Sequence, residues 1–365
     1  MGPQTSASIG DRIRARQEVL RPGERQADLA ARVGMSESAL SRAVNGKRGL
    51  AGEELVALAK DLRVSVDWLL TGQDPFPVLL AARHRYSKEN GYAHELAGEA
   101  EAAVRGIKNV YQMAYGNTGH AAAQVPANPD QARRMLAEGY GADWVRHFAD
   151  AIEKVFRVDV VRLPLPESDG LSLKLGSSTV IALPQGSMWS RQNWTLAHEL
   201  GHIAKGDFSH LHEGATSGGE AAANAFAAQL LMPEESMRKV SWQELTDQQL
   251  GEYLWEWGVS LKALQTRIQS LGLPPLRTET KPMALLNLAV PRKSPILSEP
   301  DRRQGLATSR RFPVRLLQDF ESRSISDRAL AWMLGTDVDE LRPLSSAQDP
   351  SANDLMRAFG LTAAG

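Results

Sequence analysis

A pair of histidines in the segment TLAHELGHIAK restricts the fold of this chain more than any other feature. His198 and His202 are four residues apart, so on an α-helix they share one face with Cβ atoms about 5 to 6 Å apart. Both imidazoles could then reach one metal ion at about 2.0 to 2.1 Å. Glu199 follows directly, where it could take a proton from water as a general base. The alternative is two surface histidines that flank a helical glutamate.

The composition limits which residues can complete such a site. The 365 residues include no cysteine, which excludes disulfides and thiolate ligands, so further ligands must be histidines or carboxylates. Lys and Arg number 42 against 43 Asp and Glu, and 42% of residues are hydrophobic, as in soluble globular proteins of two or three domains. The first residues lack the apolar core of a signal peptide, and no run approaches the roughly 20 apolar residues of a membrane span. A cytoplasmic location is therefore expected.

A catalytic zinc site needs three protein ligands and an open fourth position. Glu220, eighteen residues after His202, opens an Ala-rich helix and is the preferred third ligand. Asn224, one turn later, could orient a histidine ring as a hydrogen-bond acceptor. Glu220 could instead be a first-turn glutamate that the helix dipole favours. Competing ligands in the intervening loop are His210, His212, Asp207 and Glu213.

Around this site the hydrophobic patterns predict an α+β fold that is mostly helical. Period-2 patterns predict three strands at 157–163, 171–175 and 179–183. Helical patterns are expected at 78–116, 131–156, 190–205, 219–231 and 259–273. The last 80 or so residues carry the basic segment DRRQGLATSRR and the segment SDRALAWML but no nameable motif.

Three segments in this order resemble the ImmA/IrrE (DUF955) metallopeptidase family: RQNWTLAHELGHIAKG, EAAANAFAAQLLMP and WGVSLKALQTRIQSLGL. The resemblance covers about residues 130–273 and implies a zincin-like domain with a small β-sheet and one Zn²⁺ per chain. It assigns zinc ligation to His198, His202 and Glu220, and the general base to Glu199. Asn193, Trp194 and Ala222 depart from residues common in the family.

The first 76 residues predict five short helices, at 9–20, 26–33, 37–45, 53–62 and 66–70. Residues 11–49 carry nine Lys or Arg against five Asp or Glu, whereas residues 50–76 carry two against five. This asymmetry suits a face turned toward phosphate, although solvated helix faces would give the same numbers.

The pattern Gln26, Ala30, Gly34-Met35-Ser36, Leu40-Ser41 and Asn45-Gly46-Lys47-Arg48 resembles the XRE, phage-repressor-like helix-turn-helix. In that fold the second helix of the pair lies in the major groove. The resemblance implies base-edge or backbone contacts from Gln26, Ser38, Ser41 and Arg42, and phosphate contacts from Asn45, Lys47 and Arg48. A five-helix protein-docking module is the alternative.

The sequence thus predicts three parts: a helix-turn-helix domain at 1–76, a metallopeptidase domain at 77–275, and a C-terminal extension at 276–365. The resemblances together imply a DNA-binding regulator whose zinc endopeptidase cleaves a transcriptional repressor, with double-stranded operator DNA and that repressor as partners. The alternatives are a regulator whose peptidase-like domain senses or docks a partner, and an antitoxin or autorepressor that only binds DNA. Homodimerisation and the oxyanion-stabilising residue are left open.

Overall fold

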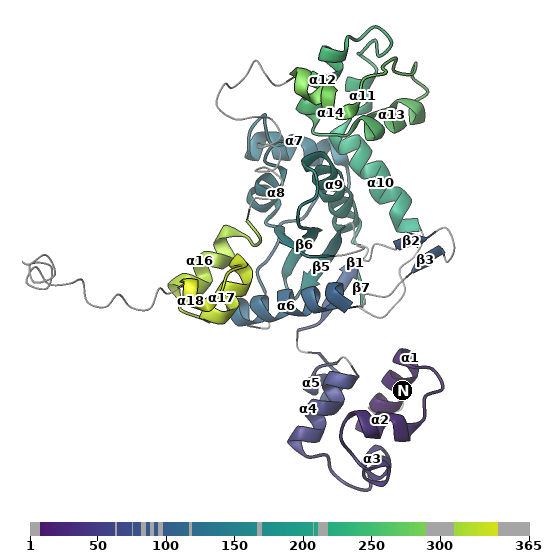
Figure 1. Cartoon of the computed structure of the whole chain (residues 1–365), viewed down its shortest axis with the longest axis vertical. Helices are drawn as coiled ribbons and strands as arrows, with labels where there is room; N and C mark the ends of the chain where they lie inside the picture. Colours follow the sequence, from purple (N-terminus) through teal and green to yellow (C-terminus); the bar gives the residue numbers. More distant parts are fainter. Residues whose placement is uncertain are drawn as a thin grey trace, which may run out of the picture. The chain divides into compact units, whose positions relative to one another are not determined.

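The computed structural model describes residues 8–62, 64–74, 76–81, 85–87, 91–93, 98–116, 119–165, 170–206, 208–210, 218–289 and 310–341. The chain divides into two compact units, residues 1–77 and 78–365 (Figure 1). No helix in the described ranges is long and apolar enough to cross a membrane.

The first unit consists of five helices, as the sequence predicts. They are α1 (Ile9–Leu20), α2 (Gln26–Arg32), α3 (Glu37–Val44), α4 (Gly52–Asp61) and α5 (Val66–Thr71). Ser36 begins α3, because its side chain accepts a hydrogen bond from the Ala39 amide and so satisfies one free donor of the first turn. Gly34 turns the chain between α2 and α3 with a φ of +70°, which suits glycine. The helices enclose a core that includes the fully buried Ile13, Leu29, Leu40, Leu58 and Leu69.

The second unit is built on a five-stranded sheet with the order β4-β6-β5-β1-β7. Its strands are β1 (Val78–Ala81), β4 (Asp159–Leu163), β5 (Leu171–Leu175), β6 (Ser178–Pro184) and β7 (Ser209–His210). β4 and β6 are parallel, and the other neighbouring pairs are antiparallel. β2 (Arg85–Ser87) and β3 (Gly91–Ala93) form a separate antiparallel pair. β4, β5 and β6 are the three strands predicted from the period-2 patterns.

Two helical expectations are wrong in part. The segment from Val78 is strand β1, which pairs with β5 and β7, and helix α6 begins only at Gly98. A four-residue apolar run is ambiguous between helix and strand, and β1 finds its partner β5 more than 90 residues along the chain. The segment 131–156 forms two helices rather than one, α7 (Pro129–Gly139) and α8 (Phe148–Phe156), with Gly141 at a φ of +132° between them.

Helix α9 connects the sheet to the remaining helices. It packs against β5, β6 and β1, and α10 packs along α9 (Figure 1). Leu196, Leu200 and Leu230 lie in a large buried apolar cluster of the unit. The helices of this part are α6 (Gly98–Tyr115), α9 (Trp189–Lys205), α10 (Gly218–Leu231), α11 (Glu234–Met237), α12 (Asp247–Trp257), α13 (Leu261–Ser270) and α14 (Pro282–Ala289).

The C-terminal helices α16 (Val314–Ser322), α17 (Asp327–Leu334) and α18 (Val338–Leu341) belong to the same compact unit. α16 contacts α6, and a partly buried polar network joins these segments to β4. Arg315 Nη2 donates to both carboxylate oxygens of Asp159, at 2.9 and 2.7 Å, and the Tyr111 hydroxyl donates to Asp159 Oδ2 at 2.6 Å. The segment that contains α16 has no recognisable sequence motif, but specific contacts hold it to strand β4. The predicted class, a mostly helical α+β fold, is confirmed.

Candidate functional site

Helix α9 places the two predicted histidines side by side. The ring centroids of His198 and His202 are 4.8 Å apart in an edge-on arrangement, and their Nε2 atoms are 3.1 Å apart. Both side chains are buried, with 1% and 3% of their surface exposed. The i, i+4 spacing therefore produces the shared face that the sequence predicts.

Helix α10 adds a carboxylate to this pair. Glu220 Oε2 lies 3.3 Å from His198 Nε2, and Oε1 lies 3.4 Å from His202 Nε2. One donor atom from each residue can be chosen so that all lie within 4.8 Å of one another. The structure thus brings together the three residues expected to bind metal.

The close approach of α10 to α9 depends on Gly201. A Cβ atom at this position would lie 2.9 Å from the Ala223 Cα and 3.1 Å from the Phe226 Cβ. The first of these obstacles is backbone, which cannot rotate away. The glycine of the HELGH segment therefore lets α10 come close enough to present Glu220, a role that the sequence analysis did not assign.

The donor set of this cluster suits a metal ion. His198 Nδ1 is 3.0 Å from Asn224 Oδ1, and an amide oxygen can only accept a hydrogen bond. This contact places a proton on Nδ1 and leaves the Nε2 lone pair directed at the cluster. Two imidazole nitrogens and a carboxylate that meet in a buried space form a suitable set for a divalent transition metal.

Glu199 is fully buried beside this cluster, and strand β5 fixes one of its oxygens. Ser172 Oγ donates to Glu199 Oε2 at 2.6 Å, while Oε1 is buried and has no hydrogen-bond partner among the described residues. Gly170 lies against the same side chain, since a Cβ there would be 2.4 Å from Thr195 Cγ2 and 3.3 Å from Glu199 Oε1. One carboxylate oxygen is thus oriented and the other is left without a partner. Neither Ser172 nor Gly170 is predicted from the sequence, where the only signal is a serine within an apolar strand.

The loop between α9 and α10 carries the four residues that the sequence offers as alternative metal ligands. Asp207, His212 and Glu213 lie outside the described residues, and of His210 only the backbone, in β7, is described.

In the first unit, α3 (Glu37–Val44) and the residues directly after it carry all of the predicted DNA contacts except Gln26. Ser38, Arg42, Asn45 and Lys47 are exposed, whereas Ser41 and Gln26, the first residue of α2, are half-buried. Arg42 Nε donates to the Ser38 carbonyl at 3.3 Å, and Asn45 Nδ2 donates to the Ser41 carbonyl at 2.9 Å. These contacts hold Arg42 against α3 and Asn45 against its C-terminal end.

Arg48 is engaged within the unit. Its Nε donates to the Ala39 carbonyl at 3.1 Å, and its guanidinium forms an ion pair with Glu54. These contacts give Arg48 a structural role whether or not it also approaches phosphate. Arg14, which the sequence analysis left out, reaches the same surface, where its Nη1 lies 3.5 Å from Asn45 Oδ1.

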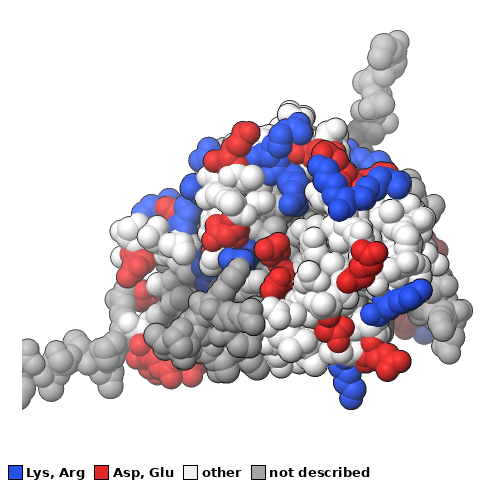
Figure 2. All heavy atoms as spheres, turned by 90° about the horizontal axis from the view of Figure 1, so that it is seen from above, with Lys and Arg blue, Asp and Glu red and all other residues white. Residues whose placement is uncertain are grey.

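Net charge does not single out an interface. The chain carries a formal charge of −1, and on the face drawn in Figure 2 basic and acidic side chains are intermingled.

Two family models match the chain. Residues 153–269 match the IrrE N-terminal-like domain, a peptidase family, and residues 25–69 match the helix-turn-helix. Both matches fall on the segments in which the sequence resemblances were found.

Two solved structures are similar to the first unit. The P22 c2 repressor protein in complex with synthetic operator 9T is 42% identical over 18% of this chain and 98% of that chain, with a TM-score of 0.17. The DNA-binding domain of the P22 c2 repressor in solution is 40% identical over 19% and 88%, with a TM-score of 0.18. No match was found among curated proteins.

Proposed function

We propose that this chain, which joins an XRE-type helix-turn-helix to an IrrE N-terminal-like peptidase domain, is a DNA-binding transcriptional regulator with a zinc-dependent endopeptidase. The observation that carries the proposal is the convergence of His198, His202 and Glu220 beside a carboxylate with one free buried oxygen. The proposed substrate is a transcriptional repressor or similar regulator, and the proposed location is the cytoplasm, where operator DNA is found.

Zinc is the metal that this donor set favours. Two histidines and one carboxylate are a common catalytic zinc set, and they leave one coordination position open. When bound, zinc would supply Lewis-acid polarisation of a carbonyl and increase the acidity of water. We expect one ion per chain, held by His198, His202 and Glu220.

The surrounding residues have separate roles in this proposal. Glu199 accepts a proton at Oε1, while Ser172 holds Oε2 and so fixes the direction of the free oxygen. Asn224 fixes the His198 tautomer and leaves its Nε2 able to bind metal. Ser172 and Asn224 are positioning residues, because each acts through another side chain.

The first unit would carry the chain to an operator. Base-edge or backbone contacts are proposed for Gln26, Ser38, Ser41 and Arg42, and phosphate contacts for Asn45, Lys47 and Arg48. The partner is double-stranded DNA. A protease held at an operator would meet a neighbouring DNA-bound repressor at raised effective concentration.

One observation favours a second candidate, in which the peptidase-like domain senses or docks a partner without proteolysis. His198, His202 and Glu199 expose 3% of their surface or less. A peptide must reach these groups to be cut, whereas a sensor could keep the metal enclosed.

The test combines metal content with proteolysis. Purified full-length protein should hold about one zinc per chain by elemental analysis, and His198→Ala and Glu220→Ala should each lose it. His147→Ala and Glu235→Gln, both at exposed positions, are matched controls that should keep the metal.

Glu199→Gln separates the two candidates. It should keep zinc, since Glu199 is not a ligand, and should lose cleavage of a repressor encoded beside the gene. Full zinc in His198→Ala and Glu220→Ala would contradict the metal site. Zinc-loaded wild type that cuts no neighbouring regulator would instead support the sensor.

A further inference from the structure

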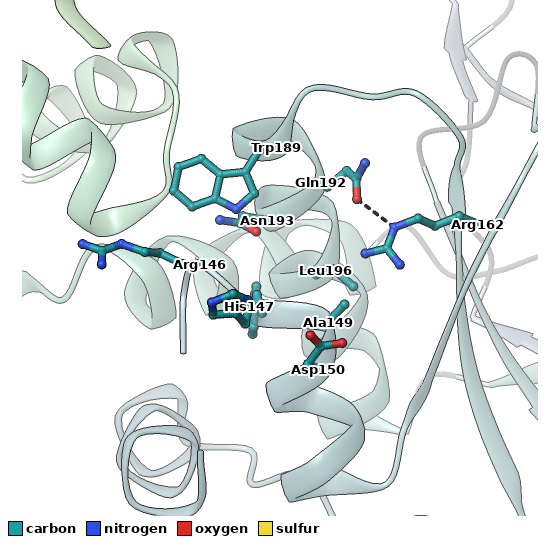
Figure 3. Close-up of a pocket in the computed structure, with 10 residues that line it drawn as sticks. Arg146, His147, Ala149, Asp150, Arg162, Trp189, Gln192, Asn193 and Leu196 are labelled. Atoms are coloured by element: carbon teal, nitrogen blue, oxygen red, sulfur yellow. Dashed lines mark hydrogen bonds between the residues drawn. The ribbon is translucent and has the colours of Figure 1, made fainter. Parts of the chain in front are cut away.

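A pocket lies on the other side of α9 from the metal cluster. Trp189, Gln192, Asn193 and Leu196 line it along one helix face, with spacings of three and four residues (Figure 3). His198 follows Leu196 by two residues, which is about 200° of helix rotation. The cavity measures about 220 Å³ and takes no residue from the metal site.

The pocket contains a buried cation without an ion-pair partner. Arg162 on β4 is 3% exposed, its Nε donates to Gln192 Oε1 at 3.1 Å, and its Nη1 donates to the Arg310 carbonyl at 3.3 Å. Among the described residues no carboxylate oxygen lies within 4.0 Å of the Arg162 guanidinium nitrogens. Asp150 lines the same pocket, but its Oδ1 is held by Arg310 at 2.6 Å. Asp150 and Glu153 act on Arg162 only from beyond ion-pair distance, and both are paired with Arg310, so an anion from outside would stabilise this buried guanidinium.

A second polar group lies in the same wall. Trp189 is 4% exposed, and its buried Nε1 has no hydrogen-bond partner in the described part of the chain. Trp189 is also the first residue of α9, a 17-residue helix whose N-cap Met188 supplies no side-chain acceptor and whose first turn has no acidic residue. The positive end of the helix dipole is therefore not compensated there by a side chain of the helix. A buried donor without a partner and an uncompensated helix end both favour a negatively charged ligand.

We propose that this pocket binds a small organic carboxylate. The carboxylate accepts hydrogen bonds from Arg162 and from the Trp189 indole, and the apolar part of the ligand lies against Leu196 and Phe148. The cavity is smaller than the roughly 300 to 1,000 Å³ of pockets for drug-sized ligands, which limits the ligand to a short acid. An α-amino acid satisfies the same chemistry, because Asp150 in the pocket wall can accept its ammonium group. This inference does not depend on peptidase activity.

Calorimetric titration of the full chain tests the charge requirement. The probes are isovalerate, benzoate and L-leucine, each compared with its neutral amide. At least one acid should bind at a single saturable site, and its amide should bind on the order of tenfold more weakly or worse, because the charge-assisted hydrogen bond is lost. L-leucine binding more tightly than isovalerate would assign the ligand to the amino acids, and the reverse order to simple acids. Binding by none of the acids, or equal binding by the amides, would overturn the proposal.

Variants then locate the site. Arg162→Gln should weaken the acid on the order of tenfold or more. Arg133→Gln is the control, because Arg133 is a half-buried arginine that also donates to a backbone carbonyl, that of Leu230 at 2.8 Å, but does not line this pocket. If Arg162→Gln does not fold, Trp189→Phe keeps an aromatic ring, removes the N–H and should weaken binding on the order of fivefold. Unchanged affinity in a folded Arg162→Gln or in Trp189→Phe would refute the assignment.

Discussion

Replacing Gly201 by alanine should separate the two helices that carry the metal cluster. The new Cβ would lie 2.9 Å from the Ala223 Cα, closer than real Cβ contacts, so α10 must move by some tenths of an ångström. Glu220 stands on α10 and the two histidines stand on α9. The substitution should therefore lower both the stability of the second unit and its affinity for metal.

The magnitude follows from two opposing effects. Alanine is favoured over glycine inside a helix by about 1 kcal/mol. Overpacking a tight contact costs about 1 to 3 kcal/mol, and a backbone obstacle places this case in the upper part of that range. The free energy of unfolding should thus fall by about 1 to 2 kcal/mol.

Urea unfolding followed by tryptophan fluorescence measures this change in the second unit, because only Trp68 of the eight tryptophans precedes residue 78. Gly139→Ala is the matched control. Its Cβ would meet Val155 Cγ2 at 2.8 Å, a side-chain atom rather than backbone, so its stability should fall by less than that of Gly201→Ala, and its response to zinc should stay that of wild type. Zinc should also raise the stability of Gly201→Ala less than that of wild type. A Gly201→Ala protein as stable as wild type, with the same zinc stabilisation, would refute the argument that this glycine sets the α9–α10 distance.

Three further changes test other parts of the account. Ser172→Ala should slow hydrolysis on the order of tenfold with zinc content unchanged, because Glu199 loses its orienting hydrogen bond. Ser172→Thr keeps the hydroxyl and should retain part of the rate. Full activity in Ser172→Ala would exclude the positioning role. Fluorescence anisotropy measures binding to operator and to random duplex DNA. Arg42→Ala should cost about 1 to 3 kcal/mol more binding free energy on the operator than on random DNA, whereas Lys47→Ala should weaken both equally and reduce the salt dependence. Equal losses on the two DNAs for Arg42→Ala would mean that Arg42 does not contact a base. Arg315→Gln should lower the free energy of unfolding by about 2 to 3 kcal/mol, because Asp159 is left buried with fewer hydrogen-bond donors. A loss below about 0.5 kcal/mol would mean that this network does not hold the C-terminal helices.

Local signals account for what the sequence predicted well. The Ser36 side chain caps α3 by accepting a hydrogen bond from the Ala39 amide, and Gly34 supplies a positive φ, so the helix-turn-helix is determined by nearby residues. The same holds for His198 and His202, whose spacing needs only one helix. Glu220 was harder to place, because its position depends on how α10 packs.

The features that were missed arise from contacts distant in sequence. Strand β1 is defined by its pairing with β5, and its four residues are too few to show a period. Ser172 acquires a role only when β5 packs beneath α9 and brings its hydroxyl to Glu199. The packing of α16 likewise depends on Arg315 reaching Asp159, a contact between residues 156 positions apart.

The most direct test of the central claim is anomalous diffraction at the zinc edge from crystals grown with zinc. The account predicts one strong peak per chain within about 2.0 to 2.2 Å of His198 Nε2, His202 Nε2 and a Glu220 carboxylate oxygen. Glu199→Gln crystals should keep that peak, and Glu220→Ala crystals should lose it or show it much weakened. A peak bound by other residues, or an unchanged peak in Glu220→Ala, would contradict the proposed metal centre.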